Sequence, residues 1–487
     1  MLGFLESSAL SAVLRDGGTV GHTQQSCRVC FSVRFGALGL GLLLFSALFL
    51  THKILPVSGA ERLRLIIETD AGGDPDDEQS LVRFLLYANE WDIEGLIANR
   101  PVARDGENQN PERTGLGIVR RLVDAYGQCW TNLVQHDVRY PTRSNLWQRT
   151  VAGHGGTDAA VQLLIAAVDS ADPRPLWYSD WGTDQGAATN NLKRVLDRVL
   201  RERGPTGYAR FKSRLRLSSA DKFGMHTAMV EPPFPLWVDT FRPELDGRRW
   251  YHRFSALTAR AGGFDLVRDC LTGHGPLGAL YPTNTTHWQK EGDTGTFLYL
   301  IPTGMNDPEE PTWGSWPGRY GANTNFPERP YFWANQTDDW NGVTNRDNTL
   351  ARWATALQND FRARLDWCVT AFSEANHPPI VRLPGGAKRI VRIGEKVIMD
   401  AGESTDPDGQ PLRFEWFIYP EAGSYRGPQP VLANVDRAQA SLVVPSVVVQ
   451  ETLHVIVAVS DTGMPALTRY QRIVLTLLPM GAASGSR

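Results

Sequence analysis

The sequence has few cysteines and almost no excess of one charge, and both deficits exclude classes of protein. Only five cysteines occur in 487 residues, and Cys27 and Cys30 precede the body of the chain, so a small disulfide-stapled scaffold is excluded. Cys129, Cys270 and Cys368 lie far apart and lack the spacing of zinc ligands, so we expect buried free thiols or at most one disulfide. Lys plus Arg (50) nearly balances Asp plus Glu (53), which argues against a nucleic-acid polymer as partner.

Several catalytic motifs are also absent. The ten histidines form no His-x-His or His-Glu-x-x-His pattern, and no Gly-x-Ser-x-Gly elbow or phosphate-binding loop occurs. Zinc hydrolases, serine esterases and NTPases are therefore disfavoured. His154 and His274 lie in Gly-rich loops, where a substrate-binding role competes with ordinary loop hydrogen bonding.

Only one long apolar run occurs, at residues 35–50, between Arg34 and Lys53. It is short for a membrane helix of about 20 residues but fits the core of a signal peptide, and residues 58–60 supply small side chains for cleavage. We expect residues 1–60 to be a signal peptide, with an uncleaved N-terminal membrane anchor as the alternative. Either segment exports the body to the periplasm or the extracellular space, with no other contact to the membrane.

The body of the chain alternates between strand and helix signals. Residues 62–67 form a β-rich apolar run, residues 78–90 carry apolar side chains at helical spacing, and residues 93–98 form the next β-rich run. Further runs with helix or strand signals are residues 115–127, 158–170, 175–181, 190–204, 214–219 and 296–302. This order predicts an α/β domain over residues 61–376, with a mostly parallel open sheet and helices on both faces.

The pattern changes after residue 376. Short β-rich runs at residues 388–393, 396–401, 412–419, 440–446, 453–461 and 472–478 are separated by turn residues. They predict an all-β immunoglobulin-like sandwich over residues 377–480, followed by a disordered tail at 481–487. The Asp406-Pro-Asp408-Gly segment is first of all a turn signal, with a second Ca²⁺ site as the weaker alternative.

The most informative segment is an acidic turn, residues 68–78, Glu-Thr-Asp-Ala-Gly-Gly-Asp-Pro-Asp-Asp-Glu. It follows the first predicted strand, at the sheet edge where open α/β sheets place their ligands. So many unpaired carboxylates would repel one another, whereas Ca²⁺ or Mg²⁺ takes oxygen ligands and a Gly-rich turn can fold around it. The alternative is a solvated loop in which Asp76 and Asp77 cap the next helix.

This turn resembles the Asp-x-Asp-x-Gly-x-Asp-Asp motif of the nucleoside hydrolase superfamily. Longer matches in the same order resemble a family of exported bacterial cellulose-binding proteins that have a nucleoside-hydrolase-like domain followed by a β-domain. They are residues 69–81, 274–278, 291–294, 306–320 and 376–379. The resemblance implies a nucleoside-hydrolase-like fold, a calcium (Ca²⁺) cofactor, and a sugar-containing small molecule or polysaccharide as partner.

The resemblance also implies roles for individual residues. Asp70 would bind the metal and act as general base, Asp76 would assist catalysis at the sugar hydroxyls, and Asp77 would bind the metal through both oxygens. Asp307 matches the late metal ligand, and Asn99 the sugar-binding amide. The implied function is hydrolysis of N- or O-glycosyl bonds by an Asp-activated water.

Two departures from the motif support a second hypothesis. The turn between Asp70 and Asp76 is two residues longer than in the hydrolase motif, and Asn306 stands where many nucleoside hydrolases carry a histidine that helps the base to leave. A neutral amide cannot protonate a leaving group. The alternative is therefore a non-catalytic, cellulose-binding protein that keeps the hydrolase-like pocket; a homodimer is left open in either case.

Aromatic residues are available to bind a sugar. Of fifteen tryptophans, Trp313, Trp316, Trp333 and Trp340 lie close together in the sequence. Indole rings stack well on the apolar faces of sugars, although most tryptophans serve packing. We expect Trp313 and Trp316, with Asn306, to bind substrate.

Overall fold

The computed structural model describes residues 61–107, 110–182, 190–219, 236–237, 250–285, 289–322 and 332–480. The predicted signal peptide or anchor and the predicted tail lie outside these residues. Within the described ranges, no helix is both long enough and apolar enough to cross a membrane.

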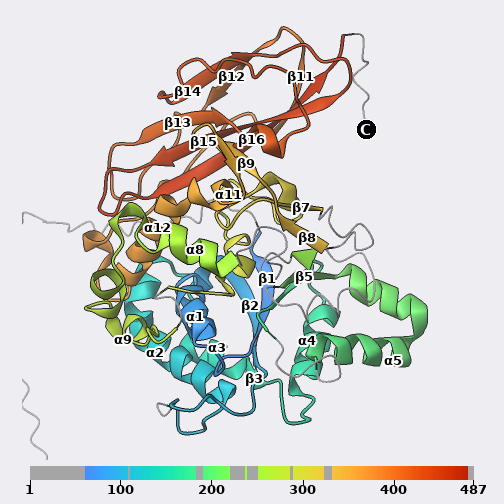
Figure 1. Ribbon diagram of the computed structural model, residues 1–487, viewed down its shortest axis with the longest axis vertical. Helices are drawn as coiled ribbons and strands as arrows, with labels where there is room; N and C mark the ends of the chain where they lie inside the picture. The colour runs from blue at the N-terminus through green and yellow to red at the C-terminus, as the bar shows by residue number, and fades with distance from the viewer. Residues whose placement is uncertain are drawn as a thin grey trace, which may run out of the picture. The chain divides into compact units, whose positions relative to one another are not determined.

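An eight-stranded sheet forms the centre of the α/β part (Figure 1), with strand order β3-β2-β1-β4-β5-β6-β8-β7. All neighbouring strands are parallel except β7 and β8. The strands are β1 (Leu63–Thr69), β2 (Trp91–Ala98), β3 (Thr150–Ala152), β4 (Leu176–Asp180), β5 (Leu215–Ser219), β6 (Leu236–Trp237), β7 (Tyr320–Ala322) and β8 (Phe332–Asn335). The predicted parallel sheet is confirmed.

Helices cover both faces of this sheet, which explains why its strands are continuous apolar runs. Successive side chains of β1 alternate between two cores: Leu65 and Ile67 belong to one, and Ile66 belongs to the other. Figure 1 shows α1 (Asp76–Leu86) and α2 (Gly115–His136) on one side of the sheet, with α4 (Ala159–Asp169) and α5 (Asn191–Ser213) on the other.

The described residues form six further α-helices, of which α12, with 13 residues, is the longest. They are α3 (Arg143–Gln148), α8 (Trp250–Thr258), α9 (Gly275–Ala279), α10 (Thr294–Leu298), α11 (Asn348–Ala351) and α12 (Ala354–Asp366). The apolar run at residues 296–302 therefore lies partly in the short, buried helix α10, not in a strand. Periodicity alone does not distinguish a buried strand from a buried helical turn over so few residues.

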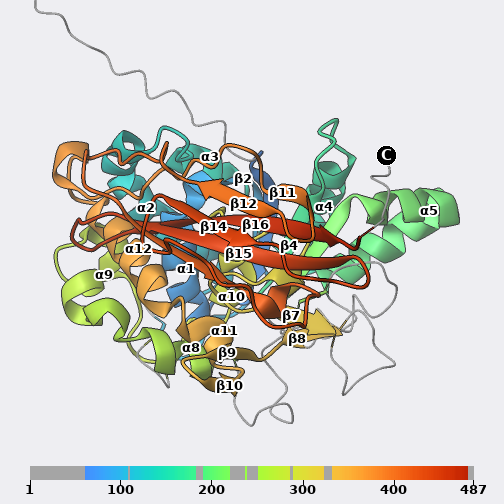
Figure 2. The same ribbon diagram turned by 90° about the horizontal axis from the view of Figure 1, so that it is seen from above.

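The C-terminal part is all β, as predicted, and its strands appear from above in Figure 2. One sheet has the order β11-β16-β15-β13, and a second pairs β12 with β14. Residues of both sheets, among them Met399, Leu442, Val455 and Val457, share one core, which makes the arrangement a sandwich. The strands are β11 (Lys388–Arg392), β12 (Lys396–Asp400), β13 (Arg413–Ile418), β14 (Gln439–Val443), β15 (Glu451–Ser460) and β16 (Thr468–Leu478).

Buried polar contacts join the β-sandwich to the α/β part, and the described residues between 61 and 480 belong to one compact unit. Arg472 Nε of β16 donates to the Met305 carbonyl at 2.6 Å, and Tyr470 N donates to the Thr303 carbonyl at 2.9 Å. The Tyr419 hydroxyl donates to Asp338 Oδ2 at 2.6 Å. Because Asp338 is fully buried, this contact contributes directly to stability.

Candidate metal centre

The acidic turn connects β1 to α1 at the carboxyl edge of the sheet. Its backbone closes through Gly73 N, which donates to the Asp70 carbonyl at 3.2 Å. Gly72 has a φ of 103°, in the left-handed region that a side chain would strain. The glycines therefore let the chain reverse between the strand and Asp76, the first residue of α1.

Three carboxylates meet at this turn. Asp76, Asp77 and Asp293 each present an oxygen, and these oxygens all lie within 4.8 Å of one another. Asp293 comes from the loop before α10. The approach of this loop requires Gly292, because a Cβ at that position would lie 2.1 Å from Asp76 Oδ2. The structure thus supplies a third carboxylate that the sequence analysis did not select.

The carboxylates of this cluster repel one another. Burial raises the pKa of Asp77 well above its ordinary value, and the charges of Asp293, Asp70 and Asp76 raise it further. Burial also raises the pKa of Asp76, whereas the nearby Lys290 opposes that rise. A cation would remove this repulsion.

The alternative of a solvated capping loop does not fit the structure. Asp77 is 4% exposed, and its carboxylate accepts a hydrogen bond from the Thr69 hydroxyl. Helix α1 has Pro75 as its N-cap and no side-chain hydrogen bond to cap its first turn. Burial of Asp77 is therefore not explained by helix capping.

Asp70 lies beside the cluster and is less buried. Its side chain is 20% exposed, and Arg100 Nη1 lies 3.7 Å from its Oδ2. Gly182, after β4, approaches so closely that a Cβ there would lie 2.7 Å from Asp70 Oδ1. Among the predicted catalytic and metal residues, the structure brings Asp70, Asp76 and Asp77 together.

A lysine at the edge of the cluster is a functional candidate that sequence reasoning missed. Lys290 pairs with Asp74, and its Nζ lies 3.0 Å from Asp76 Oδ2. Its side chain is 10% exposed, and the two carboxylates raise its pKa against the effect of burial. The signal for Lys290 was its place directly before the matched residues 291–294.

Asn99 and Glu68 are buried beside the turn and are hydrogen-bonded to each other. Glu68 is fully buried and accepts from Asn99 Nδ2 at 3.0 Å, from Asn191 Nδ2 at 2.8 Å and from the Tyr178 hydroxyl. Burial raises the pKa of Glu68. Asn99 Nδ2 also donates to the Gly182 carbonyl at 2.6 Å, while its Oδ1 is buried and has no hydrogen-bond partner among the described residues.

These observations test whether the residues fit a Ca²⁺ ion. Buried carboxylates that repel one another, an unsatisfied amide oxygen and two glycines at close approach make an oxygen-rich cradle. All of the donors are hard oxygen atoms, which suit Ca²⁺ or Mg²⁺ and not a soft metal. The residues present therefore fit the predicted cation.

Asp307 and Asn306 do not join the cluster. Asp307 Oδ1 accepts from Glu309 N at 3.1 Å, and Asn306 Nδ2 donates to the Tyr299 carbonyl at 2.5 Å. They follow Met305, whose carbonyl accepts from Arg472 of the β-sandwich. The loop that returns to the acidic turn comes earlier in the chain, so Asp293, and not Asp307, lies beside Asp76 and Asp77. The residue before Asp293 is Gly292, so no histidine stands there either.

The two loop histidines have different surroundings. His274 Nε2 lies 3.0 Å from the Arg268 carbonyl, and its Nδ1 lies 3.2 Å from Asp366 Oδ1 at the end of α12, so contacts with Arg268 and Asp366 account for its position. His154 follows β3, and its buried Nε2 has no partner among the described residues. Burial lowers the pKa of His154. His154 thus stays a candidate for the sugar side of the site.

The predicted sugar-stacking tryptophans pack instead at the β-sandwich. Trp313 meets the His454 ring edge-on, with centroids 5.0 Å apart. Trp316 is 1% exposed, and the Arg469 guanidinium lies 5.8 Å from its ring. The side chain of Trp333 lies outside the described residues, and Trp340, which ends β9 (Asp338–Trp340), is 37% exposed.

The carboxylates of the turn at residues 406–408 accept hydrogen bonds from other groups of the protein. Asp408 accepts from His377 N at 2.7 Å, and its other oxygen lies 2.8 Å from His377 Nδ1. Asp406 Oδ1 accepts from Asp408 N and Gln410 N. Both residues therefore serve the turn and its contact with the linker after α12.

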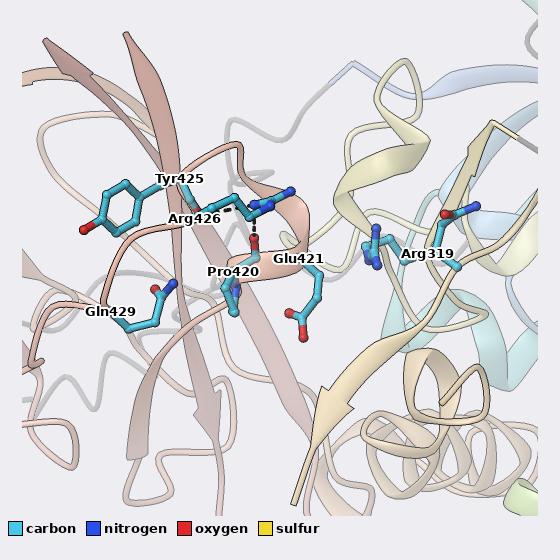
Figure 3. A pocket seen from close by; sticks show the side chains of 7 residues that line it. Arg319, Pro420, Glu421, Tyr425, Arg426 and Gln429 are labelled. Atoms are coloured by element: carbon cyan, nitrogen blue, oxygen red, sulfur yellow. Dashed lines mark hydrogen bonds between the residues drawn. The ribbon is translucent and has the colours of Figure 1, made fainter. Parts of the chain in front are cut away.

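A polar cavity of about 390 Å³ lies between the two parts of the chain (Figure 3). It is lined by Arg319, Gln336, Pro420, Glu421, Tyr425, Arg426 and Gln429. None of the predicted site residues lines it.

Comparisons with known proteins agree with this architecture. The model of the family described as cellulose-binding Sde182, nucleoside hydrolase-like domain, matches residues 64–320. A second model, the C-terminal domain of cellulose-binding protein Sde0182, matches residues 396–477. No curated protein matches the chain.

A solved structure is similar over most of the chain. It is a nucleoside hydrolase-related hypothetical protein from Saccharophagus degradans that is associated with carbohydrate metabolism, and it shares 30% identity with a TM-score of 0.68. The match covers 86% of this chain and 100% of that one. A second solved structure, a PKD domain from KIAA 1837 protein, shares 18% identity with a TM-score of 0.16. That match covers 21% of this chain and 92% of that one, and it is too weak to indicate a fold or a function. The chain belongs to the cellulose-binding Sde182 family, with its nucleoside-hydrolase-like domain followed by the family's C-terminal domain.

Proposed function

We propose that the protein is a Ca²⁺-dependent hydrolase of N- or O-glycosyl bonds. The observation that carries the proposal is the meeting of Asp76, Asp77 and Asp293, with Asp70 beside them, at the carboxyl edge of a parallel sheet. Buried carboxylates that repel one another are costly to keep without a cation.

In this proposal the carboxylates at the turn hold the cation and activate the attacking water. Asp77 and Asp293, both buried, hold the cation together with Asp70. Bound Ca²⁺ would lower the pKa of a coordinated water and orient vicinal sugar hydroxyls. Asp70, the more exposed carboxylate, takes the proton from the attacking water, and Asn99 Oδ1 accepts a hydrogen bond from a sugar hydroxyl.

The leaving group receives no proton from the position before the late aspartate, because Gly292 has no side chain. A hydrolase with this site therefore favours substrates whose leaving group departs as a stable anion. Nitrophenyl glycosides and ribosides are expected to react faster than purine nucleosides or cellulose.

The second candidate function is carbohydrate binding without turnover. The pairing of Lys290 with Asp76 favours it, because a carboxylate paired with an ammonium group is a weaker metal ligand. The name of the matched family, cellulose-binding, supports a polysaccharide as the ligand.

The two functions are separated by one pair of assays on the full chain. Release of reducing sugar or nitrophenol is measured over a panel of ribosides, nucleosides and β-glycosides, with and without chelator, beside a pull-down on insoluble cellulose. Chelator-sensitive turnover that is lost in Asp77→Asn and kept in Asp307→Asn supports the hydrolase. Cellulose retention with no turnover of any substrate contradicts the hydrolase and supports the binder.

We also propose that the body of the protein is exported, on the strength of the apolar run at residues 35–50. N-terminal sequencing of protein recovered from the host's exported fraction tests this and distinguishes cleavage after Ala60 from a retained anchor. Recovery of the whole chain from the cytosol alone would contradict export.

A further inference from the structure

Two buried thiols from distant parts of the chain lie against each other. Cys129, in α2, is 1% exposed, and Cys368, just after α12, is 3% exposed. Both are free thiols in this structure, and each shifts the pKa of the other. The Cys368 thiol donates to the Arg364 carbonyl, with Sγ 3.7 Å from the oxygen. About 240 residues separate them in the sequence.

The packing around the pair fixes this contact. Gly275, the first residue of α9, lies so close that a Cβ there would be 3.2 Å from Cys129 Sγ and 3.7 Å from Cys368 Cβ. Asn132 Nδ2, one turn along α2 from Cys129, donates to the Cys368 carbonyl at 2.9 Å. Helix α9 lies beside α2 in both views (Figures 1 and 2). Gly275 of α9 and Asn132 of α2 therefore keep Cys129 and Cys368 side by side.

The third cysteine of the body has other surroundings. Cys270 is fully buried, and its Sγ lies 3.8 Å from the Gly278 carbonyl. Burial raises the pKa of the Cys270 thiol. Cys270 is thus an internal comparison for the reactivity of the pair.

We propose that Cys129 and Cys368 form a disulfide bond when the chain folds in the presence of a thiol–disulfide oxidant. The proposal does not depend on the proposed hydrolase or binding function. The sequence left open which of the three cysteines of the body, if any, are paired, and the proposal selects Cys129 and Cys368.

The oxidant is a disulfide such as oxidised glutathione. The Cys129 thiolate attacks one of its sulfurs, which forms a mixed disulfide and releases one glutathione thiolate. Cys368 then loses its proton and attacks the Cys129 sulfur, which releases the second glutathione. The protein loses two protons and two electrons, and the oxidant gains both.

The two thiols differ in acidity in the folded chain. The neighbouring Cys368 lowers the pKa of Cys129, whereas the same contact and burial raise the pKa of Cys368. The reverse order, in which Cys368 attacks the oxidant first and Cys129 resolves the mixed disulfide, gives the same product. Because both sulfurs are buried in the folded chain, the first step takes place during folding or local opening.

The disulfide would stabilise the folded protein. It would tie α2 to the end of α12 and close a loop of about 240 residues, which restricts the unfolded chain. The reduced and oxidised forms are therefore expected to differ in melting temperature by several degrees.

The test refolds the full wild-type chain in a glutathione redox buffer, alkylates remaining thiols in denaturant and maps the peptides by mass. The expected product is a Cys129–Cys368 linked peptide, two hydrogens lighter than the reduced pair, with Cys270 alkylated. Cys270→Ser is expected to keep the link, and Cys368→Ser to leave Cys129 alkylated. Reduction is expected to lower the melting temperature of wild type and of Cys270→Ser only.

A second measurement avoids dependence on refolding. Wild-type chain isolated directly from an oxidising compartment, such as the bacterial periplasm, is alkylated and mapped in the same way. Folded protein with both Cys129 and Cys368 alkylated, or with Cys270 in the cross-link, would overturn the proposal.

Discussion

Lys290 places its Nζ 3.0 Å from Asp76 Oδ2 and pairs with Asp74 on the other side. The ammonium group of Lys290 thus lies at one edge of the carboxylate cluster that we propose to bind Ca²⁺. Like charges at this distance repel, and burial weakens the screening by water.

Removal of this charge is expected to tighten cation binding. Lys290→Gln keeps a hydrogen-bond donor near Asp76 but not the charge, so the Kd for Ca²⁺ is expected to fall by about tenfold, which corresponds to about 1.4 kcal/mol. Isothermal titration measures this Kd directly. The control is Lys193→Gln, which removes a lysine that pairs with Asp197 on the exposed surface of α5. An unchanged or weaker affinity in Lys290→Gln would show that Lys290 does not compete with the cation.

Asp293 is expected to destabilise the protein when no cation is bound. Its charge raises the pKa of the buried Asp77, so Asp293→Asn is expected to increase the free energy of unfolding in chelator by about 1–2 kcal/mol. The same variant is expected to lose the rise in melting temperature that Ca²⁺ causes in wild type. Thermal melts with and without Ca²⁺ check both expectations; a variant less stable than wild type in chelator contradicts the account.

His454 makes the junction with the β-sandwich sensitive to acid. Burial and the adjacent Arg472 lower the pKa of His454 to about 3, and Arg472 Nη1 lies 3.0 Å from His454 Nδ1, so Nδ1 accepts that hydrogen bond as a neutral ring. The unfolded chain binds the proton first, near the ordinary pKa of 6.5. Stability is therefore full above about pH 6.5 and falls as pH decreases toward 3, by an amount on the order of 4 kcal/mol.

The variant His454→Gln isolates this contribution, because glutamine can accept from Arg472 and does not titrate. Unfolding by denaturant is measured between pH 4 and pH 7 for both proteins. The wild-type stability is expected to fall more steeply with decreasing pH than that of the variant. Parallel pH profiles would remove His454 from the explanation.

Tyr419 couples the two parts of the chain through Asp338, which is fully buried and also lies 2.8 Å from Arg319 Nε. Tyr419→Phe removes a hydrogen bond to a buried carboxylate and is expected to cost about 2 kcal/mol of unfolding free energy. Tyr425→Phe is the control, because the Tyr425 hydroxyl donates only to the nearby Pro428 carbonyl at 3.0 Å. Equal losses in the two variants would show that the contact with Asp338 has no special weight.

Much of the fold could be predicted because its signals are local. The apolar run of β1, the helical spacing of α1 and the short β-rich runs after residue 376 all lie in consecutive residues, and each formed the expected element. The acidic turn was predictable for the same reason, since Asp70, Asp76 and Asp77 lie within one loop of an open α/β sheet.

The rest of the site depends on which distant loop of the chain packs against this turn. The spacing of residues in the sequence does not indicate which loop that is. Asp293 reaches Asp76 only because Gly292 has no Cβ, whereas Asp307 belongs to a turn that faces the β-sandwich. Trp313 and Trp316 were expected at a sugar for their ring chemistry, but the β-sandwich covers them. A close contact between domains buries aromatic residues that a sequence pattern alone assigns to a ligand.

The most direct test of the central claim is a calorimetric titration of Ca²⁺ into chelator-treated full-length protein, with Asp293→Asn and Asp307→Asn measured beside wild type. The account predicts one site in wild type, the same site in Asp307→Asn, and its loss in Asp293→Asn. Absence of Ca²⁺ binding by wild type, or binding lost in Asp307→Asn but kept in Asp293→Asn, would contradict it.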